Sequence, residues 1–159
     1  YFVQKKSDGK RKISLNVNKL LRKKKQLELD KIATFKKFSK YIQKTRNDLL
    51  VLITKLKSKR KTIAGYGASG RGTIIMNYCG LDSDFLKYVI DDAPAKQGAY
   101  TPGTHLKIVP NTVLQSANRP DYVVLFAWPF IEEVKKRNNE YLKNRGKFIV
   151  PLPKVRIVS

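Results

Sequence analysis

The feature of this sequence that most constrains its fold is a glycine-rich turn between a short apolar segment and a helix. Residues 62–66 are typical of a short strand, and the six residues from Gly65 to Gly70 match the pattern G-x-G-x-x-G. Residues 73–79 then continue as a helix that Gly80 closes. Glycines let the backbone turn tightly and approach a pyrophosphate, and a helix N-terminus offers free N–H groups and a partial positive charge. The pattern predicts a nucleotide-binding turn; the alternative is a tight strand-to-helix turn that binds nothing.

Strands and helices alternate over the rest of the chain. Residues 122–127 form a continuous apolar run, as in a central strand that is covered on both faces. The other predicted strands are 88–90, 107–109 and 147–150, and the other predicted helices are 111–117 and 130–143. Such alternation implies a parallel sheet with right-handed crossovers. We therefore expect residues 62–159 to form an α/β domain, a Rossmann-like parallel sheet flanked by helices.

The first 61 residues have a different character. Two short extended pieces around an Asp-Gly turn predict a β-hairpin over residues 1–15, which belongs to a sheet lying partly outside the chain. Residues 16–61 predict basic amphipathic helices, one of them about 30 residues long, with apolar residues recurring at steps of three and four. That apolar stripe needs a partner surface, within the chain or on another copy, so the sequence leaves the oligomeric state open.

The formal net charge of +22 suggests a nucleic-acid binder, but its distribution argues against one. Residues 1–61 hold 21 basic and four acidic residues, whereas residues 62–159 hold 13 basic and eight acidic residues. The lysines of the helical segment are typical of a solvated face, because no aromatic residues interleave with them as base-stacking requires. Binding of nucleic acid by the basic helices remains a third interpretation, after the two given below.

Several classes of protein are disfavoured by composition. No apolar run approaches the roughly 20 residues that span a bilayer, so no membrane segment is expected. Cys79 is the only cysteine and His105 the only histidine, which argues against a disulfide framework and against a metal site. We expect a cytoplasmic protein. Cys79 is interpreted as a buried small hydrophobe.

The predicted site lies at the carboxyl ends of the strands, where open α/β sheets bind ligands. Arg71 follows the glycine turn and offers a planar fork that grips phosphate. Asp91 or Asp92, about 20 residues further on, can accept a hydrogen bond from a ribose hydroxyl. Tyr100 and His105 lie in the loop after the second strand, where they either face a ligand or are purely structural. No pair of residues suits acid–base catalysis, so no catalytic residue is predicted.

A set of short motifs in a fixed order resembles a known family. They are Gly65-Tyr66-Gly67-Ala68-Ser69-Gly70-Arg71-Gly72, Asn77-Tyr78-Cys79-Gly80, Asp91-Asp92, Lys96-Gln97-Gly98, Pro102-Gly103-Thr104-His105, Pro120-Asp121-Tyr122-Val123, Ala127-Trp128 and the ending at residues 146–151. Over nearly the whole chain, this combination resembles the C-terminal domain of sugar C-methyltransferases. These enzymes use S-adenosylmethionine to methylate a carbon of a nucleotide-linked deoxysugar.

The resemblance implies a three-part enzyme with a zinc-binding N-terminal domain, a central methyl-donor domain and this C-terminal domain, with the hairpin at the edge of the upstream methyltransferase domain. The nucleotide-linked sugar would then lie between the last two domains. Its diphosphate would be held by Gly65, Tyr66, Gly67, Ala68, Ser69, Gly70 and Arg71, with Lys96, Tyr100 and His105 on the rim. S-adenosylmethionine and structural zinc would belong to the other domains, so this chain is expected to bind neither and to be inactive alone.

One position departs from the family pattern and keeps an alternative open. Position 70 is often a small residue other than glycine in the family, so Gly70 strengthens the general dinucleotide pattern instead. The alternative is an NAD(P)-binding oxidoreductase domain or a plain dinucleotide-binding module. Against it, no substrate domain and no hydride-transfer partner follow the glycine turn.

Overall fold

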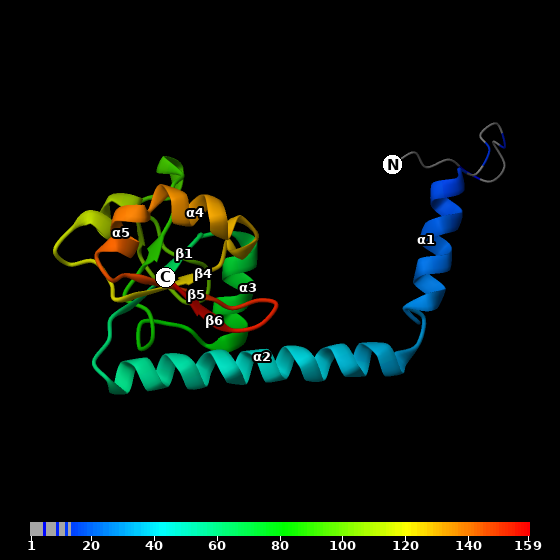
Figure 1. Ribbon diagram of the computed structural model, residues 1–159, viewed down its shortest axis with the longest axis horizontal. Helices are drawn as coiled ribbons and strands as arrows, with labels where there is room; N and C mark the ends of the chain where they lie inside the picture. The colour runs from blue at the N-terminus through cyan, green and yellow to red at the C-terminus, as the bar shows by residue number, and fades with distance from the viewer. Residues whose placement is uncertain (1–4, 6–8, 10–11, 13) are drawn as a thin grey trace. The chain divides into compact units, whose positions relative to one another are not determined.

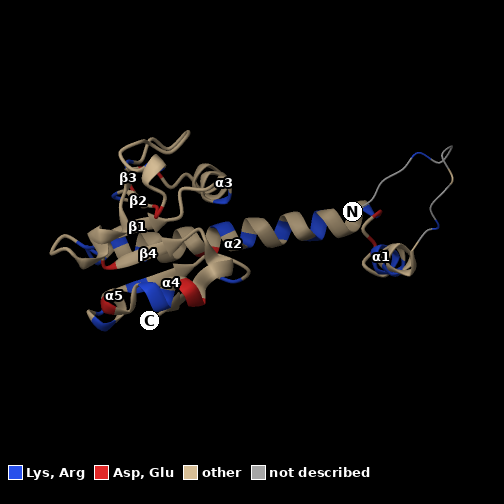
Figure 2. Cartoon of the chain, turned by 90° about the horizontal axis from the view of Figure 1, so that it is seen from above, with Lys and Arg blue, Asp and Glu red and all other residues tan. Residues whose placement is uncertain are grey.

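The computed structural model describes residues 5, 9, 12 and 14–159, and the chain divides into two compact units, Tyr1–Ile42 and Gln43–Ser159. The predicted hairpin rests on residues outside this described part. The first unit contains α1 (Leu15–Gln26), which buries no side chain, and the start of α2 (Ile32–Ser58). Lys and Arg recur along both helices (Figure 2). No described helix has the length and apolar character needed to cross a membrane.

The second unit is built on one six-stranded sheet, which is mostly parallel (Figure 1). Its strands are β1 (Ile63–Tyr66), β2 (Val89–Ile90), β3 (Ile108–Val109), β4 (Tyr122–Leu125), β5 (Lys147–Val150) and β6 (Arg156–Val158). Their spatial order is β3-β2-β1-β4-β5-β6, and only β6 runs antiparallel to its neighbour. The mixed α/β architecture and the parallel core of the sheet are as predicted.

Helices cover both faces of the sheet, because the central strands bury side chains on each side. On one face, Ile63 of β1 and Val124 of β4 pack with α2 and with α3 (Gly70–Cys79). On the other face, Ala64 and Val123 pack with two short helices near the C-terminus. These are α4 (Ile131–Arg137) and α5 (Asn139–Lys143). The short 3-10 helix η3 (Asn111–Gln115) also packs on this face. Further 3-10 helices are η2 (Pro94–Lys96) and η4 (Trp128–Phe130).

The last turns of α2 are part of the core of the second unit. Leu49, Ile53 and Leu56 lie four and three residues apart, so they share one helix face, and all three are buried against the sheet. The compact unit therefore begins at Gln43, ahead of residue 62, where the charge pattern changes. The end of α2 carries lysines on its exposed face and apolar residues on its buried face. The charge pattern therefore groups it with the basic segment, whereas packing groups it with the sheet.

Two predicted helices differ from the structure. The single helix predicted over residues 130–143 is wrong, because the chain forms α4 and α5 with a break at Asn138. Asn138 is buried, and its Nδ2 atom donates a hydrogen bond to the carbonyl of Val134 at 2.9 Å. An amide that competes with the helix backbone in this way favours a break. The helix predicted over residues 111–117 is the shorter 3-10 helix η3, and β6 was not predicted.

Asp121 ties the start of β4 to the start of β1. Its carboxylate accepts hydrogen bonds from the backbone N–H and the hydroxyl of Thr62, at 2.8 and 2.9 Å, and from Lys61 Nζ at 3.1 Å. Partial burial alone would raise the pKa of Asp121, but these hydrogen bonds outweigh it and lower the pKa below the ordinary value.

This lowered pKa predicts a pH-dependent contribution to stability. A carboxylate whose pKa is lower in the folded state stabilises fully above its unfolded pKa of about 3.9 and loses that contribution as the pH falls through the folded value. We expect Asp121→Asn to lower the midpoint of urea unfolding at pH 6 and to lower it less at pH 3. An equal difference between variant and wild type at both pH values would contradict this account.

Candidate functional site

The glycine turn directly follows the central strand β1. Gly67 has a positive φ of 101°, and its N–H donates to the carbonyl of Ile90 at 2.7 Å. A side chain there would also lie 3.3 Å from the backbone nitrogen of Ala127. Glycine is therefore favoured at position 67 chiefly by its backbone conformation, and the close approach of the chain after β4 leaves little room for a side chain.

Ser69 begins the helix that follows the turn and leaves its first N–H groups free. The Ser69 hydroxyl accepts from the N–H of Gly72 at 3.3 Å, as an N-cap does. The N–H groups of Ala68, Gly70 and Arg71 have no acceptor among the residues that the structure describes. These donors and the positive end of α3 point out of the carboxyl edge of the sheet, which is the arrangement that accepts a phosphate.

The close packing of helix against strand depends on Gly72 instead of Gly70. A Cβ atom on Gly72 would lie 2.5 Å from the carbonyl oxygen of Gly67, whereas a Cβ atom on Gly70 would meet nothing within 4 Å. Gly65 is also confined, since its Cβ atom would lie 2.6 Å from the ring of Phe126. The third glycine of the predicted pattern is thus open to substitution, and the glycine two residues later is not.

The turn lies where the order of strands reverses. From β1 the chain passes through α3 to β2 and β3 on one side, and then returns to place β4 on the other side of β1. Open α/β sheets usually bind ligands at the carboxyl ends of the strands where the order reverses, which here is the edge formed by the ends of β1 and β4. Arg71 lies at this edge, and its Cζ atom is 5.4 Å from the centre of the Trp128 ring and 5.9 Å from the centre of the Phe130 ring.

The two aspartates after β2 have separate surroundings. Asp91 is buried; its Oδ1 atom accepts from the N–H of Ala93 at 2.9 Å, and its Oδ2 atom lies 3.2 Å from Lys96 Nζ. The structure thus brings together Asp91 and Lys96, two residues predicted for the site. The charge of Lys96 is thus balanced by Asp91, which lies five residues earlier in the same loop.

Asp92 instead contacts the middle residue of the glycine pattern. It accepts from the Tyr66 hydroxyl at 2.7 Å and from Arg137 at 2.5 Å. Burial, reinforced by the bond to Asp92, raises the pKa of Tyr66, and Asp92 raises the pKa of Arg137. Sequence reasoning missed Arg137 because 45 residues separate it from Asp92, and its only local signal is the pairing with Glu133 one helical turn earlier.

Tyr100 and His105 belong to a loop that is fixed to α3. Asn77 Nδ2 donates to the carbonyl of Pro102 at 3.1 Å, which joins two of the short motifs found in the sequence. Asn77 lies seven residues after Gly70, about 10 Å along the helix. Among the described residues, no hydrogen bond, ion pair or cation–π contact joins the side chain of Tyr100 or His105 to the glycine turn, and both side chains are exposed.

Neither a metal site nor a reactive thiol is evident in the described residues. They contain no group of three or more His, Cys, Asp or Glu side chains placed to hold an ion. Cys79 is buried at the end of α3, and burial raises the pKa of its thiol. A thiol in this state is poorly suited to act as a nucleophile.

Together, the mostly parallel sheet, the reversal of strand order and the glycine turn that opens α3 define an open α/β domain with a glycine-rich first crossover. More specifically, the chain belongs to the family of the C-methyltransferase C-terminal domain, whose model matches residues 1–153. It is similar to C-methyltransferase NovU of Streptomyces niveus, with 31% identity over 125 residues. The match covers 79% of this chain and 30% of that protein, so the chain spans about a third of the length of this relative.

Proposed function

We propose that this chain is the substrate-binding part of an S-adenosylmethionine-dependent C-methyltransferase, and that it holds a nucleotide-linked sugar by its diphosphate at a Rossmann-like site. The observation that carries the proposal is the set of free N–H groups of Ala68, Gly70 and Arg71 at the N-terminus of α3. They lie beside the reversal of strand order, and they suit the two negative charges of a diphosphate. Family membership supports the link to C-methylation.

Three residues of the turn, Gly67, Ser69 and Arg71, have distinct parts in this proposal. Gly67 lets the backbone approach the pyrophosphate, and Ser69 fixes the first turn of α3 by bonding Gly72. Arg71 is exposed, so its guanidinium can leave the aromatic rings and grip a phosphate with two N–H groups. Asp92 is half-exposed next to the turn and is better placed than the buried Asp91 to accept from a ribose hydroxyl. Lys96, Tyr100 and His105 would form the outer rim.

The chemistry of C-methylation explains why such a domain is useful. Transfer of a methyl group to a sugar carbon needs a carbanion or enolate next to a carbonyl, and therefore a base, a methyl donor and a firmly held sugar. When bound, S-adenosylmethionine supplies the electrophilic methyl group. This chain would contribute the positioning, whereas the methyl-donor site, the base and a structural zinc would lie in another part of a longer protein.

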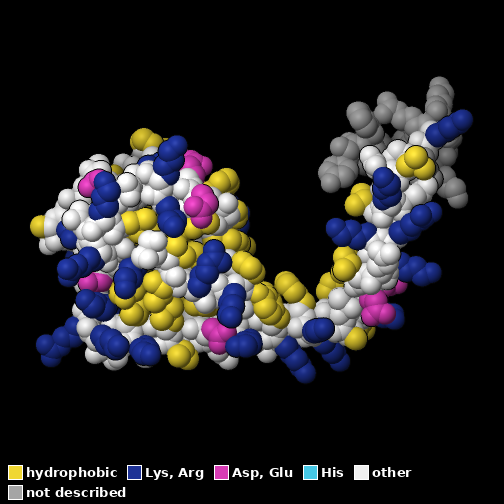
Figure 3. Space-filling view, viewed as in Figure 1, with side chains coloured by type: hydrophobic (Ala, Val, Ile, Leu, Met, Phe, Trp, Pro, Cys, Tyr) yellow, Lys and Arg dark blue, Asp and Glu magenta, His cyan; other side chains and the backbone are white. Residues whose placement is uncertain are grey.

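The first unit offers a surface for that other part. Apolar side chains remain exposed along α1 and the start of α2, as Figure 3 shows. Ile32, Phe35 and Phe38 are 73%, 55% and 60% exposed, and they fall on one face at steps of three. Exposed aromatic and aliphatic residues in such a row are typical of a surface that a partner covers. We place the methyl-donor domain there.

Titration of the chain with candidate ligands tests the proposed site. We expect a nucleoside diphosphate such as dTDP or UDP to raise the thermal unfolding midpoint by a few degrees at about 100 times its dissociation constant, because ligand bound only to the folded state adds about 2.7 kcal/mol. S-adenosylmethionine is expected to have no effect. Stabilisation by NADH or NADPH in place of the diphosphates would support the oxidoreductase alternative.

Replacement of the turn arginine gives the matching variant. We expect Arg71→Ala to weaken nucleoside diphosphate binding about tenfold, since a charge-assisted hydrogen bond contributes about 1.5–3 kcal/mol. Arg156→Ala removes the same charge from the edge strand β6, which lies three strands from β1 in the sheet, and serves as the control. Isothermal titration calorimetry on both variants measures the effect. Equal losses in the two variants would show that net charge, not the turn, is responsible.

A further inference from the structure

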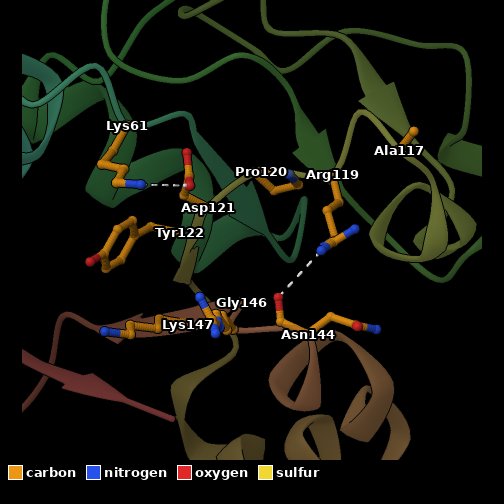
Figure 4. Close-up of a pocket in the computed structure, with 10 residues that line it drawn as sticks. Lys61, Ala117, Arg119, Pro120, Asp121, Tyr122, Asn144, Gly146 and Lys147 are labelled. Atoms are coloured by element: carbon orange, nitrogen blue, oxygen red, sulfur yellow. Dashed lines mark hydrogen bonds and ion pairs between the residues drawn. The ribbon is translucent and has the colours of Figure 1, made fainter.

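A second polar site lies at the opposite edge of the sheet from the glycine turn. It is an open hollow of about 490 Å³ at the amino ends of β1, β4 and β5 (Figure 4). The residues that line it are Lys61, Ala117, Arg119, Pro120, Asp121, Tyr122, Asn144, Arg145, Gly146 and Lys147. Because β1 and β4 are four residues long, about 13 Å of strand separates the hollow from the turn. The two sites are therefore distinct.

The hollow carries a surplus of positive charge that its own residues leave unpaired. Asp121 is the one carboxylate among the lining residues, and its partner is Lys61 at 3.1 Å. The side chain of Arg119 donates to the carbonyl of Asn144 at 3.3 Å, its one hydrogen bond among the described residues (Figure 4). Lys147 lies over the Tyr122 ring, 5.9 Å from its centre. Arg119, Arg145 and Lys147 form no ion pair with any carboxylate of the described residues.

The backbone at Arg145 adds an independent argument that its side chain matters. Arg145 ends α5 with a φ of 66°, the left-handed conformation that glycine or asparagine usually adopts at this position. The N–H of Arg145 donates to the carbonyl of Leu142 and the N–H of Gly146 to that of Tyr141, which together form a Schellman motif. Arginine in this conformation costs about 1 kcal/mol relative to glycine. No ion pair or hydrogen bond of its side chain within the described residues offsets that cost.

We propose that the hollow binds the phosphate group of a small ligand, with Arg119, Arg145 and Lys147 as the groups that contact it. Guanidinium groups match phosphate oxygens in pairs, and three cations that lack carboxylate partners suit a dianion. The volume fits a small molecule, since ligand pockets of this kind occupy about 300–1,000 Å³. The pairing of Asp121 with Lys61 keeps that carboxylate from repelling the anion.

Amide NMR of the full chain, titrated with inorganic phosphate at constant ionic strength, tests this site separately from the glycine turn. Backbone shifts of Tyr122 and Lys147 report the hollow, and those of Gly67 and Gly70 report the turn. We expect saturable shifts at Tyr122 and Lys147. Shifts confined to the turn, or shifts that do not saturate, would overturn the proposal whatever the outcome at the turn.

Arg145→Gly separates binding from folding. Because glycine favours the left-handed conformation, this variant is expected to keep or raise the thermal unfolding midpoint while the affinity read at Lys147 falls about tenfold. Arg119→Gln, which does not touch the backbone motif, is expected to weaken binding by a similar factor. An unchanged affinity in both variants would overturn the assignment of these residues.

Arg60→Gly is the matched control. Arg60 ends α2 with a φ of 55°, in the same kind of motif, and it does not line the hollow. Arg60→Gly removes the same charge as Arg145→Gly, from a residue with the same left-handed backbone conformation. Because Arg60 does not line the hollow, we expect less than a twofold change in phosphate affinity. An equal loss in Arg60→Gly and Arg145→Gly would mean that diffuse charge attracts the anion. Succinate is expected to bind several-fold more weakly than phosphate; tighter binding of succinate, or binding of duplex DNA in its place, would overturn the phosphate assignment.

Discussion

Gly72→Ala is expected to lower the free energy of unfolding by about 3 kcal/mol, which corresponds to a fall in the unfolding midpoint on the order of 10 °C. The added methyl group would lie 2.5 Å from the carbonyl oxygen of Gly67 and 3.2 Å from the side chain of Phe126. The first contact is with backbone, which cannot move aside without shifting α3 away from β1. Urea unfolding followed by circular dichroism measures the change.

Gly70→Ala is the control for this prediction, because it adds the same methyl group two residues earlier in the same helix. Position 70 has open space around it and a φ that any residue adopts, so alanine is expected to be neutral or to stabilise by about 0.5 kcal/mol. If Gly70→Ala destabilised as much as Gly72→Ala, the close approach of helix and strand would lie at the third glycine of the G-x-G-x-x-G pattern, contrary to the structure.

Ile53→Ala is expected to lower the free energy of unfolding by about 3–4 kcal/mol, within the range for large-to-small changes in a packed core. Ile53 is fully buried in the cluster that joins α2 to the sheet, beside Leu49 and Leu56. The alanine leaves a cavity that α2 cannot fill without moving along the sheet. Chemical denaturation of the full chain gives the change directly.

Val51→Ala tests whether this cost comes from the buried face of α2. Val51 is two residues away on the same helix but 68% exposed, so its truncation is expected to change stability by less than about 0.5 kcal/mol. A small effect at both positions would mean that the end of α2 is not part of the cooperative unit. A large effect at Val51 would point to a partner on its exposed face.

The parts of the fold that could be predicted from sequence are those with a strong local signal. The strands β1, β4 and β5 are apolar runs with both faces covered, and each was predicted to within two residues at either end. The break at Asn138 could not be predicted, because an asparagine inside an amphipathic pattern gives no sign that its amide will be buried against Val134. The strand β6 has only three residues, two of them exposed, so it lacks the apolar run that marked the others.

The candidate site was predictable at the turn and less so around it. The glycine pattern predicted a helix directly after the turn, but the helix begins at Gly70, three residues before the predicted range of 73–79, and the role of Ser69 as its N-cap was not predicted. The structure shows that Gly72, and not Gly70, packs closely against the turn, because only at position 72 would a side chain meet the carbonyl of Gly67. A sequence pattern holds no such distance, so this could not be predicted. The contact of Asp92 with Arg137 likewise joins residues from different crossovers. Such long-range pairs follow from topology, and the sequence alone does not order the strands.

The position of β1 between β2 and β4 has a consequence for how this domain folds. Gly65 pairs with Val89 on one side and with Val124 on the other, so the central strand meets its second neighbour only after a loop of 58 intervening residues has closed. Domains with such distant pairings fold more slowly than those built from local contacts. During synthesis, β1 exposes an unpaired edge until β4 has emerged, and a nascent chain that stalls before residue 122 is the species most exposed to aggregation.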